Sequence, residues 1–150
     1  MDWNSISELM GCDDPAEVDA AFARGGPLTG VALIGLALNV LDPALVAPRL
    51  HRAMTDDAPE IRRCGALSVG HMARLNKTVD DKSPILLRQL LEDPAPIVRG
   101  TASDALSDIW IFVRRTELPC WLHRRALLAL VRGKVQLLCS LLAQVRRSES

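Results

Sequence analysis

The chain has 150 residues, a formal net charge of zero, 49% hydrophobic residues and only 3% aromatic residues. Its 24 Leu and 18 Ala are strong helix formers, whereas a β-sandwich or barrel needs Val, Ile, Thr and aromatic residues. The high apolar content without net charge excludes a disordered chain. These features predict an all-α fold, with residues 1–150 forming a single domain.

Proline, glycine and aspartate punctuate the chain at intervals that suit helices of about 10–18 residues. Pairs such as Asp14-Pro15 and Asp42-Pro43 supply an N-cap followed by a proline at the first helical position. Gly133 is expected to separate the last two helices. About nine helices are predicted, over residues 5–10, 15–24, 27–41, 43–54, 59–75, 84–91, 94–113, 119–132 and 134–145.

The segment from Gly25 to Leu41 contains no charged residue. Its 17 residues fall short of the roughly 20 apolar residues that a membrane span needs, and a helix that is apolar all round is more simply buried in a protein core. We therefore expect a buried helix here, and no membrane partner.

An offset of 37 residues superposes two copies of one pattern. Each copy has an Asp, then a β-branched residue followed by Arg, then small residues four and seven positions after the β-branched one. The copies are Asp56, Ile61, Arg62, Gly65, Ser68 and Asp93, Val98, Arg99, Ala102, Ala105, with fainter copies starting at Leu28 and Leu122. Small residues allow close helix packing, and each Arg can reach the Asp at a neighbouring helix start. The Asp and Arg residues are therefore interpreted as structural.

This pattern resembles the HEAT-repeat family of helical solenoids. The resemblance covers residues 27–131, with residues 1–26 as N-terminal cap helices and residues 132–150 as a C-terminal cap helix and tail. It implies a short right-handed solenoid of HEAT-like repeats with a concave face.

The stretches Ser68–Leu75 and Ala102–Val113 also look like parts of small stand-alone bacterial HEAT-type proteins, several of which are immunity proteins against polymorphic toxins. The resemblance implies a non-catalytic protein-binding module that neutralises a toxin; a generic adaptor is the alternative. The four cysteines form no CxxC pair, so a reducing cytoplasm is expected, with Cys64 and Cys139 as small core residues.

The second helix of each pair lines the concave face in HEAT arrays. In residues 43–54 the core is assigned Leu45, Leu50 and Ala53, and in residues 84–91 it is assigned Ile85, Leu87, Leu90 and Leu91. The outward residues are then mainly arginines: Arg49, Arg52, Arg88, Arg124 and Arg125, with Gln89 also outward and Glu92 just beyond. An Arg-rich face of this kind favours an acidic protein partner.

A second candidate surface is the ridge of His71, Arg74, Asp104 and Asp108. His71 and Asp108 are 37 residues apart, so they are expected to be neighbours that share a hydrogen bond, either as a polar cross-link or as half of a catalytic dyad with Ser68 nearby. Asp104 and Asp108 share a helix face and could hold a metal, although a solvated acidic edge is the preferred interpretation. We expect no enzyme activity, cofactor or metal.

A nucleic-acid-binding or base-modifying HEAT-like protein is the alternative from another functional class. Residues 114–150 hold eight Lys and Arg against two acids, and Trp110 and Trp121 could stack on bases. The sequence pI of about 6.8 is low for a nucleic-acid-binding domain, and the apolar neighbours of Trp110 favour a place in the core.

Overall fold

The structure, a computed structural model, describes the backbone of residues 1–148 and the side chains of residues 1–136. This part of the chain contains helices and no strand, which confirms the all-α prediction. The eight α-helices are α1 (Ile6–Met10), α2 (Pro15–Arg24), α3 (Thr29–Asn39), α4 (Pro43–Met54), α5 (Pro59–Asn76), α6 (Lys82–Leu90), α7 (Pro96–Phe112) and α8 (Cys120–Ser148). A 3₁₀ turn, Arg115–Glu117, precedes α8.

Helix starts follow the predicted capping chemistry. The side chains of Ser5, Asp14 and Asp42 accept hydrogen bonds from backbone N–H groups in the first turns of α1, α2 and α4. α7 begins two residues later than predicted, because a residue before proline avoids the helical region, and Ala95 is extended (φ −82°, ψ 119°) ahead of Pro96.

The predicted break at Gly133 is wrong. α8 is continuous from Cys120 to Ser148, so the described chain has eight α-helices, not nine. A single glycine in a helix interior costs only about 1 kcal/mol relative to alanine, which is too little to end a helix without a second signal.

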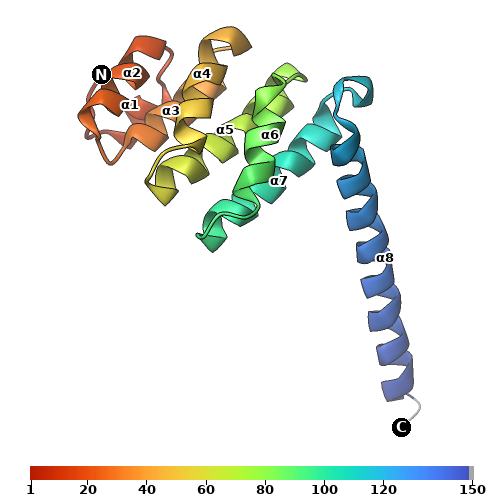
Figure 1. The fold of residues 1–150 in the computed structure, drawn as a ribbon. Helices are drawn as coiled ribbons and strands as arrows, with labels where there is room; N and C mark the ends of the chain where they lie inside the picture. The colour runs from red at the N-terminus through yellow and green to blue at the C-terminus, as the bar shows by residue number, and fades with distance from the viewer. Residues whose placement is uncertain (149–150) are drawn as a thin grey trace. The chain divides into compact units, whose positions relative to one another are not determined.

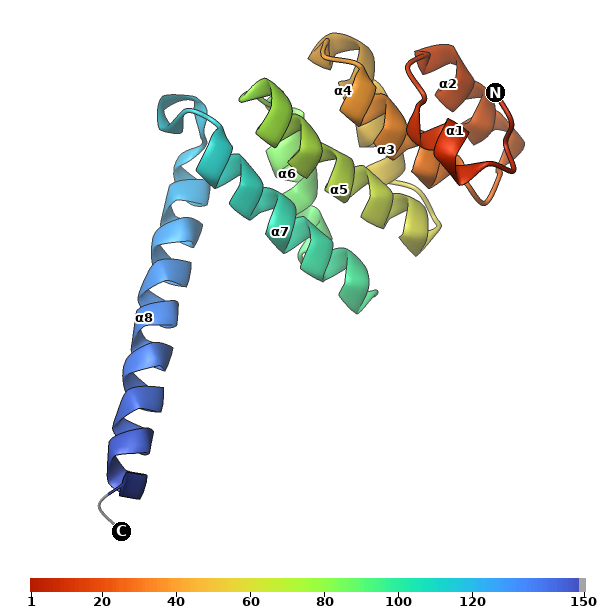
Figure 2. The same cartoon turned by 180° about the vertical axis from the view of Figure 1, so that it is seen from behind.

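The chain divides into two units, Met1–Arg114 and Arg115–Ser150. In the first unit α1, α3, α5 and α7 pack as one row, and α2, α4 and α6 form a second row against it (Figures 1 and 2). Helices of the same row are neighbours, as in α3 with α5, α5 with α7 and α4 with α6. The single domain over residues 1–150, and its assignment to right-handed HEAT-like repeats, stay predictions.

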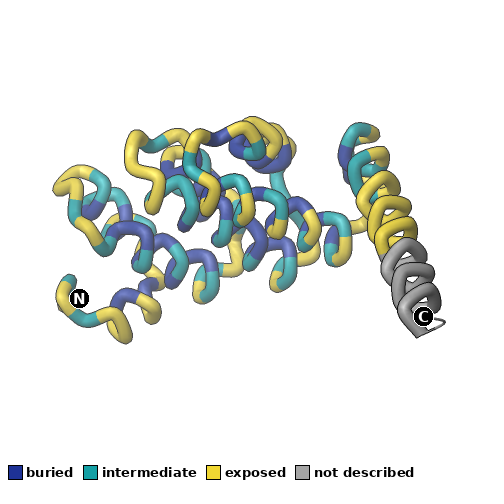
Figure 3. Tube along the Cα trace, turned by 90° about the horizontal axis from the view of Figure 1, so that it is seen from below, coloured by how far each residue is buried: buried dark blue, intermediate teal, exposed yellow. Residues whose placement is uncertain are grey.

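The core lies between these two rows, where buried residues line the inner sides of the helices (Figure 3). α3 is buried over most of its length, as predicted from its lack of charge. The small residues of the repeated pattern are at helix contacts: a Cβ on Gly65 would lie 2.9 Å from the Cβ of Ala53. Cys64 is buried as predicted, whereas the side chain of Cys139 lies outside the described residues. No described helix is both long enough and apolar enough to cross a membrane.

Candidate functional site

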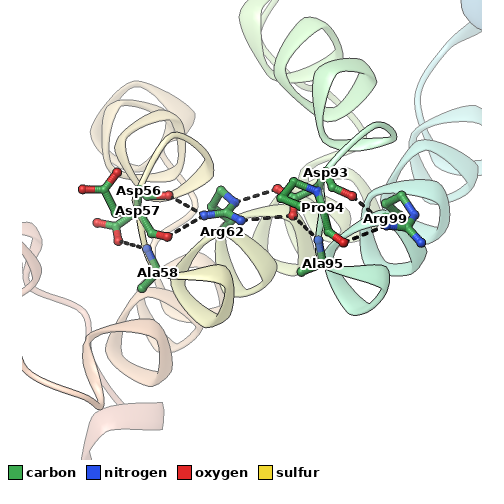
Figure 4. Close-up of polar contacts among 8 residues, drawn as sticks. All are labelled: Asp56, Asp57, Ala58, Arg62, Asp93, Pro94, Ala95 and Arg99. Atoms are coloured by element: carbon green, nitrogen blue, oxygen red, sulfur yellow. Dashed lines mark hydrogen bonds and ion pairs between the residues drawn. The ribbon is translucent and has the colours of Figure 1, made fainter.

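The repeated Asp and Arg residues form a chain of polar contacts across successive helix starts (Figure 4). Arg62 on α5 donates to both carboxylate oxygens of Asp93, at 2.6 and 3.0 Å, and its Nη1 donates to the backbone carbonyls of Asp56 and Asp57 at 2.8 Å. Arg99 repeats the second half of this pattern on the carbonyls of Asp93 and Pro94. The predicted contact between an Arg and the Asp at a neighbouring helix start is confirmed.

This contact is buried, with side chains 14% exposed for Arg62 and 5% for Asp93. The hydrogen bonds from Arg62 lower the pKa of Asp93, burial opposes them, and the N–H of Ala95 adds to the lowering. Asp93 is therefore ionised and fully engaged in holding α5, α7 and the turn between α6 and α7 together. The geometry favours a structural role.

The prediction that the side chain of Arg49 points outward is wrong. Its Nε and Nη2 donate to the two carboxylate oxygens of Asp19 on α2, its Nη1 donates to the carbonyl of Leu45, and its side chain is 21% exposed. Arg52 is exposed, but its guanidinium lies over the ring of Phe22, 4.6 Å from the centroid. Both arginines thus fasten α4 to α2, which sequence spacing could not show because the partners are 30 residues apart.

The predicted core faces of α4 and α6 are partly wrong. Leu45 is 46% exposed and Ile85 is 52% exposed. The adjacent residues Val46 and Leu86 are buried instead, so the buried face of each helix is shifted by less than one position and keeps most of its predicted members. Leu50, Ala53, Leu87 and Leu90 are buried as predicted, while Leu91 is half-buried.

Four exposed side chains on these adjacent helices now define a candidate site, which we name the α4/α6 surface. It consists of Leu45 and Arg52 on α4, and Ile85 and Arg88 on α6. Leu45 and Arg52 are seven residues apart and Ile85 and Arg88 three apart, so each pair shares one helix face. The surface offers apolar area beside positive charge.

Arg124 and Arg125 lie on α8, in the second unit. Their place on a surface shared with the arginines of α4 and α6 stays a prediction. Trp110, predicted in the core, is half-buried at the end of α7, where the next residue, Ile111, is 66% exposed. An apolar run at the end of a helix must expose part of its circumference.

The direct hydrogen bond predicted between His71 and Asp108 is wrong, although the two side chains are brought together. Arg74 lies between them: its Nη2 donates to His71 Nδ1 at 2.9 Å, and its Nε is 3.6 Å from Asp108 Oδ2. Burial and the charge of Arg74 lower the pKa of His71, while Asp108 opposes them. Asp104 is exposed one turn away.

This ridge lacks the geometry of a nucleophilic site. The nearby hydroxyl, Ser68 Oγ, is fully buried and has no hydrogen-bond partner among the described residues. A substrate would have to unpack α5 to reach it. Within the described part of the chain, no group of three or more His, Cys, Asp or Glu side chains is placed to hold a metal ion.

The structure contains a cluster of His51, Asp80 and Ser83 that was not predicted from the sequence. His51 Nε2 lies 2.8 Å from Asp80 Oδ2 and 3.3 Å from Ser83 Oγ, and Ser83 Oγ donates to Asp80 Oδ1 at 2.5 Å. In a catalytic triad the imidazole bridges the other two groups through its two nitrogens. Here the same nitrogen, Nε2, faces both groups, and Ser83 Oγ donates to Asp80, so the arrangement differs from that of a triad.

Asp80 is instead the cap of α6, accepting from the backbone N–H groups of Lys82 and Ser83 at 3.0 and 3.1 Å. Burial raises the pKa of Asp80, but the hydrogen bonds of Ser83, the charge of His51 and the backbone bonds outweigh it and lower that pKa. An Asp three residues before Ser83 is a capping signal that the sequence offered. His51, 29 residues away, gave none.

We expect Asp80→Ala to lower the free energy of unfolding by about 1–2 kcal/mol at neutral pH, since it removes a cap and a partner of His51. A carboxylate with a lowered pKa stabilises the fold above its unfolded pKa of about 3.9, and this stabilisation is lost as pH falls through the folded pKa. Melting temperatures from pH 7 to 3 should therefore converge for the variant and wild type. The matched control is Asp81→Ala, which removes no capping bond. A gap that stays constant down to pH 3 contradicts this role of Asp80.

The structure also contains a cavity of about 360 Å³ bordered by α2, α3 and α5. Phe22, Thr29 and Ile61 line it together with the carboxylates of Asp56 and Glu60. Asp56 already accepts from the N–H of Ala58 at 2.9 Å, the hydroxyl of Thr29 donates to the carbonyl of Gly26 at 2.7 Å, and the lining residues include no cationic side chain.

Comparison of the chain with models of protein families, with curated proteins and with solved structures gives no match. The likeness to HEAT repeats thus rests on the residues of the repeated pattern alone.

Proposed function

We propose that this chain is a non-catalytic protein-binding module built from HEAT-like repeats, and that it binds an acidic partner through the α4/α6 surface. The observation that carries the proposal is the exposure of Leu45 and Ile85 on adjacent helices, each with an arginine on the same face. Large apolar side chains supply area to an interface, and arginine forms charge-assisted bonds to carboxylates.

The packing behind this surface supports the proposal. α4 is tied to α2 by the Arg49–Asp19 pair and to α6 by the His51–Asp80 contact, and the row of α3, α5 and α7 packs against the row of α4 and α6. Side chains on a fixed scaffold lose less conformational entropy on binding, so more of the contact energy appears as affinity.

The sharper form of this proposal is an immunity protein that neutralises a toxin in the bacterial cytoplasm. The test is co-expression with the protein encoded by the adjacent upstream gene, with growth of the host cells as the readout. We expect the wild-type chain to restore growth, and the double variant Leu45→Asp with Ile85→Asp to lose this protection because it buries two charges in the interface.

The matched control is Leu75→Asp with Ile97→Asp, which makes the same change at side chains 49% and 55% exposed on α5 and α7. This control should still protect the cells. An upstream protein that is not toxic, or protection by the first double variant, contradicts the immunity proposal and favours a generic adaptor.

Nucleic-acid binding is the second candidate, and the observation that favours it is the charge of residues 118–148. This segment contains six cations and no acid: Arg124, Arg125, Arg132, Lys134, Arg146 and Arg147. However, large apolar residues are exposed among them, including Leu127 and Leu130, both 57% exposed. A phosphate backbone offers these side chains no apolar surface, so an apolar partner with negative charge fits α8 better.

A further inference from the structure

α8 carries a seam of exposed apolar residues. Leu128, Val131 and Val135 are 57, 58 and 53% exposed. They follow the 3-4 spacing of the first and fourth positions, a and d, in the seven-residue repeat of a coiled coil. The sequence continues this spacing at Leu138, Leu142 and Val145. Six consecutive a and d positions of a continuous helix are therefore apolar.

Four of the six cations in residues 118–148 flank this seam, while Arg124 is at a d position and Arg147 at an f position. Arg125, Arg132 and Arg146 occupy e positions of the same heptads, and Lys134 occupies a g position. Side chains at e and g reach across to the paired helix, where opposite charges select the partner. The arrangement of charge thus points at a partner helix with carboxylates at its own e and g positions.

A second copy of this chain does not supply those carboxylates, because residues 118–148 contain no Asp or Glu. A membrane surface fits less well for a different reason. Helices that lie on a bilayer place their cations on the face opposite the apolar one. The f positions opposite this seam are Ala126, Gly133, Ser140 and Arg147, so only one of the six cations in residues 118–148 is at one of them.

We propose that α8 pairs with an acidic amphipathic helix of another protein, forming a two-stranded coiled coil through Leu128, Val131 and Val135. This proposed surface belongs to the unit Arg115–Ser150, whereas the α4/α6 surface belongs to the unit Met1–Arg114.

The test uses the full chain and a synthetic 28-residue peptide of four heptads, with Leu at a and d and Glu at e and g. A peptide with Lys in place of Glu is the charge control. Fluorescence anisotropy should show the Glu peptide binding at least about 100-fold more tightly than the Lys peptide, with affinity falling as salt rises. Equal binding of both peptides, or none, would overturn the proposal.

Two variants with the same charge change locate the site. Val131→Asp with Val135→Asp should weaken binding of the Glu peptide by at least about 30-fold, since it puts charges into the seam. Ala129→Asp with Gln136→Asp changes b positions of the same heptads and should bind within about 3-fold of wild type. Circular dichroism checks that both variants keep the helix content of wild type. Equal loss in the two variants contradicts binding through the seam.

Two further measurements distinguish this partner from a membrane surface and from a second copy of the chain. Tighter binding to vesicles of phosphatidylcholine and phosphatidylserine than to the Glu peptide would replace the proposal with a membrane surface. A concentration-dependent dimer in sedimentation equilibrium, lost in the seam variant, would replace it with a second copy of the chain. Leu45→Asp with Ile85→Asp should leave binding of the Glu peptide unchanged. A negative result for the coiled coil of α8 can therefore be told apart from a negative result for the α4/α6 surface.

Discussion

Replacing Arg62 with methionine should lower the free energy of unfolding by about 3–5 kcal/mol, the cost of leaving one member of a buried ion pair without its partner. Asp93 is 5% exposed and, among the described residues, its carboxylate would retain only the N–H of Ala95 as a hydrogen-bond donor. The carbonyls of Asp56 and Asp57 would lose a donor as well. For a domain of this size the melting temperature should fall by about 10 °C or more.

Arg99→Met is the control, since Arg99 donates to two carbonyls and forms no ion pair with a carboxylate among the described residues. Its cost should be about 1 kcal/mol. Because the pKa of Asp93 is lowered in the fold, the advantage of wild type over Arg62→Met is present above the unfolded pKa and lost as pH falls through the folded pKa. Equal costs for the two variants at pH 7 would contradict the role of the Arg62–Asp93 pair.

Gly35→Ala should be destabilising by about 1–3 kcal/mol, because a Cβ there would overlap backbone atoms. On Gly35 in α3 it would lie 2.2 Å from the carbonyl oxygen of Leu9 and 3.0 Å from that of Met10. Backbone cannot rotate out of the way as a side chain can, so α1 would have to move away from α3.

Gly100→Ala, in α7, should instead raise the free energy of unfolding. A Cβ on Gly100 meets nothing within 4 Å, and alanine in a helix interior is favoured over glycine by about 0.5–1 kcal/mol. Urea denaturation of both variants should therefore give changes of opposite sign. If both variants are stabilised, α1 and α3 are not in the close contact described here.

The sequence predictions that were confirmed rest on local sequence signals and on the repeat. Capping residues and prolines predicted most helix starts, because their effects act within one turn. The 37-residue offset predicted the contact between Arg62 and Asp93, because equivalent positions of adjacent copies become neighbours when helices stack. The same offset placed His71 near Asp108, but it could not show that Arg74 would insert between them.

The features that were not predicted depend on which side chains of different helices pack against each other. Leu45 is more apolar than Arg49, yet Leu45 is exposed and Arg49 is engaged with Asp19, because the rotation of α4 is set by the combined packing of Val46, Leu50 and Ala53. The contact of His51 with Asp80 joins segments 29 residues apart with no repeat to relate them. Such pairings follow from the packed fold and leave no pattern in the sequence.

The most direct test of protein binding through the α4/α6 surface is calorimetric titration of the full chain with the purified product of the adjacent upstream gene. We predict a 1:1 complex whose dissociation constant rises by at least about 30-fold, or about 2 kcal/mol, in Leu45→Asp with Ile85→Asp. The control Leu75→Asp with Ile97→Asp should match wild type. No binding by wild type, or equal binding by the two double variants, would contradict the account, as would a partner displaced by duplex DNA at physiological salt.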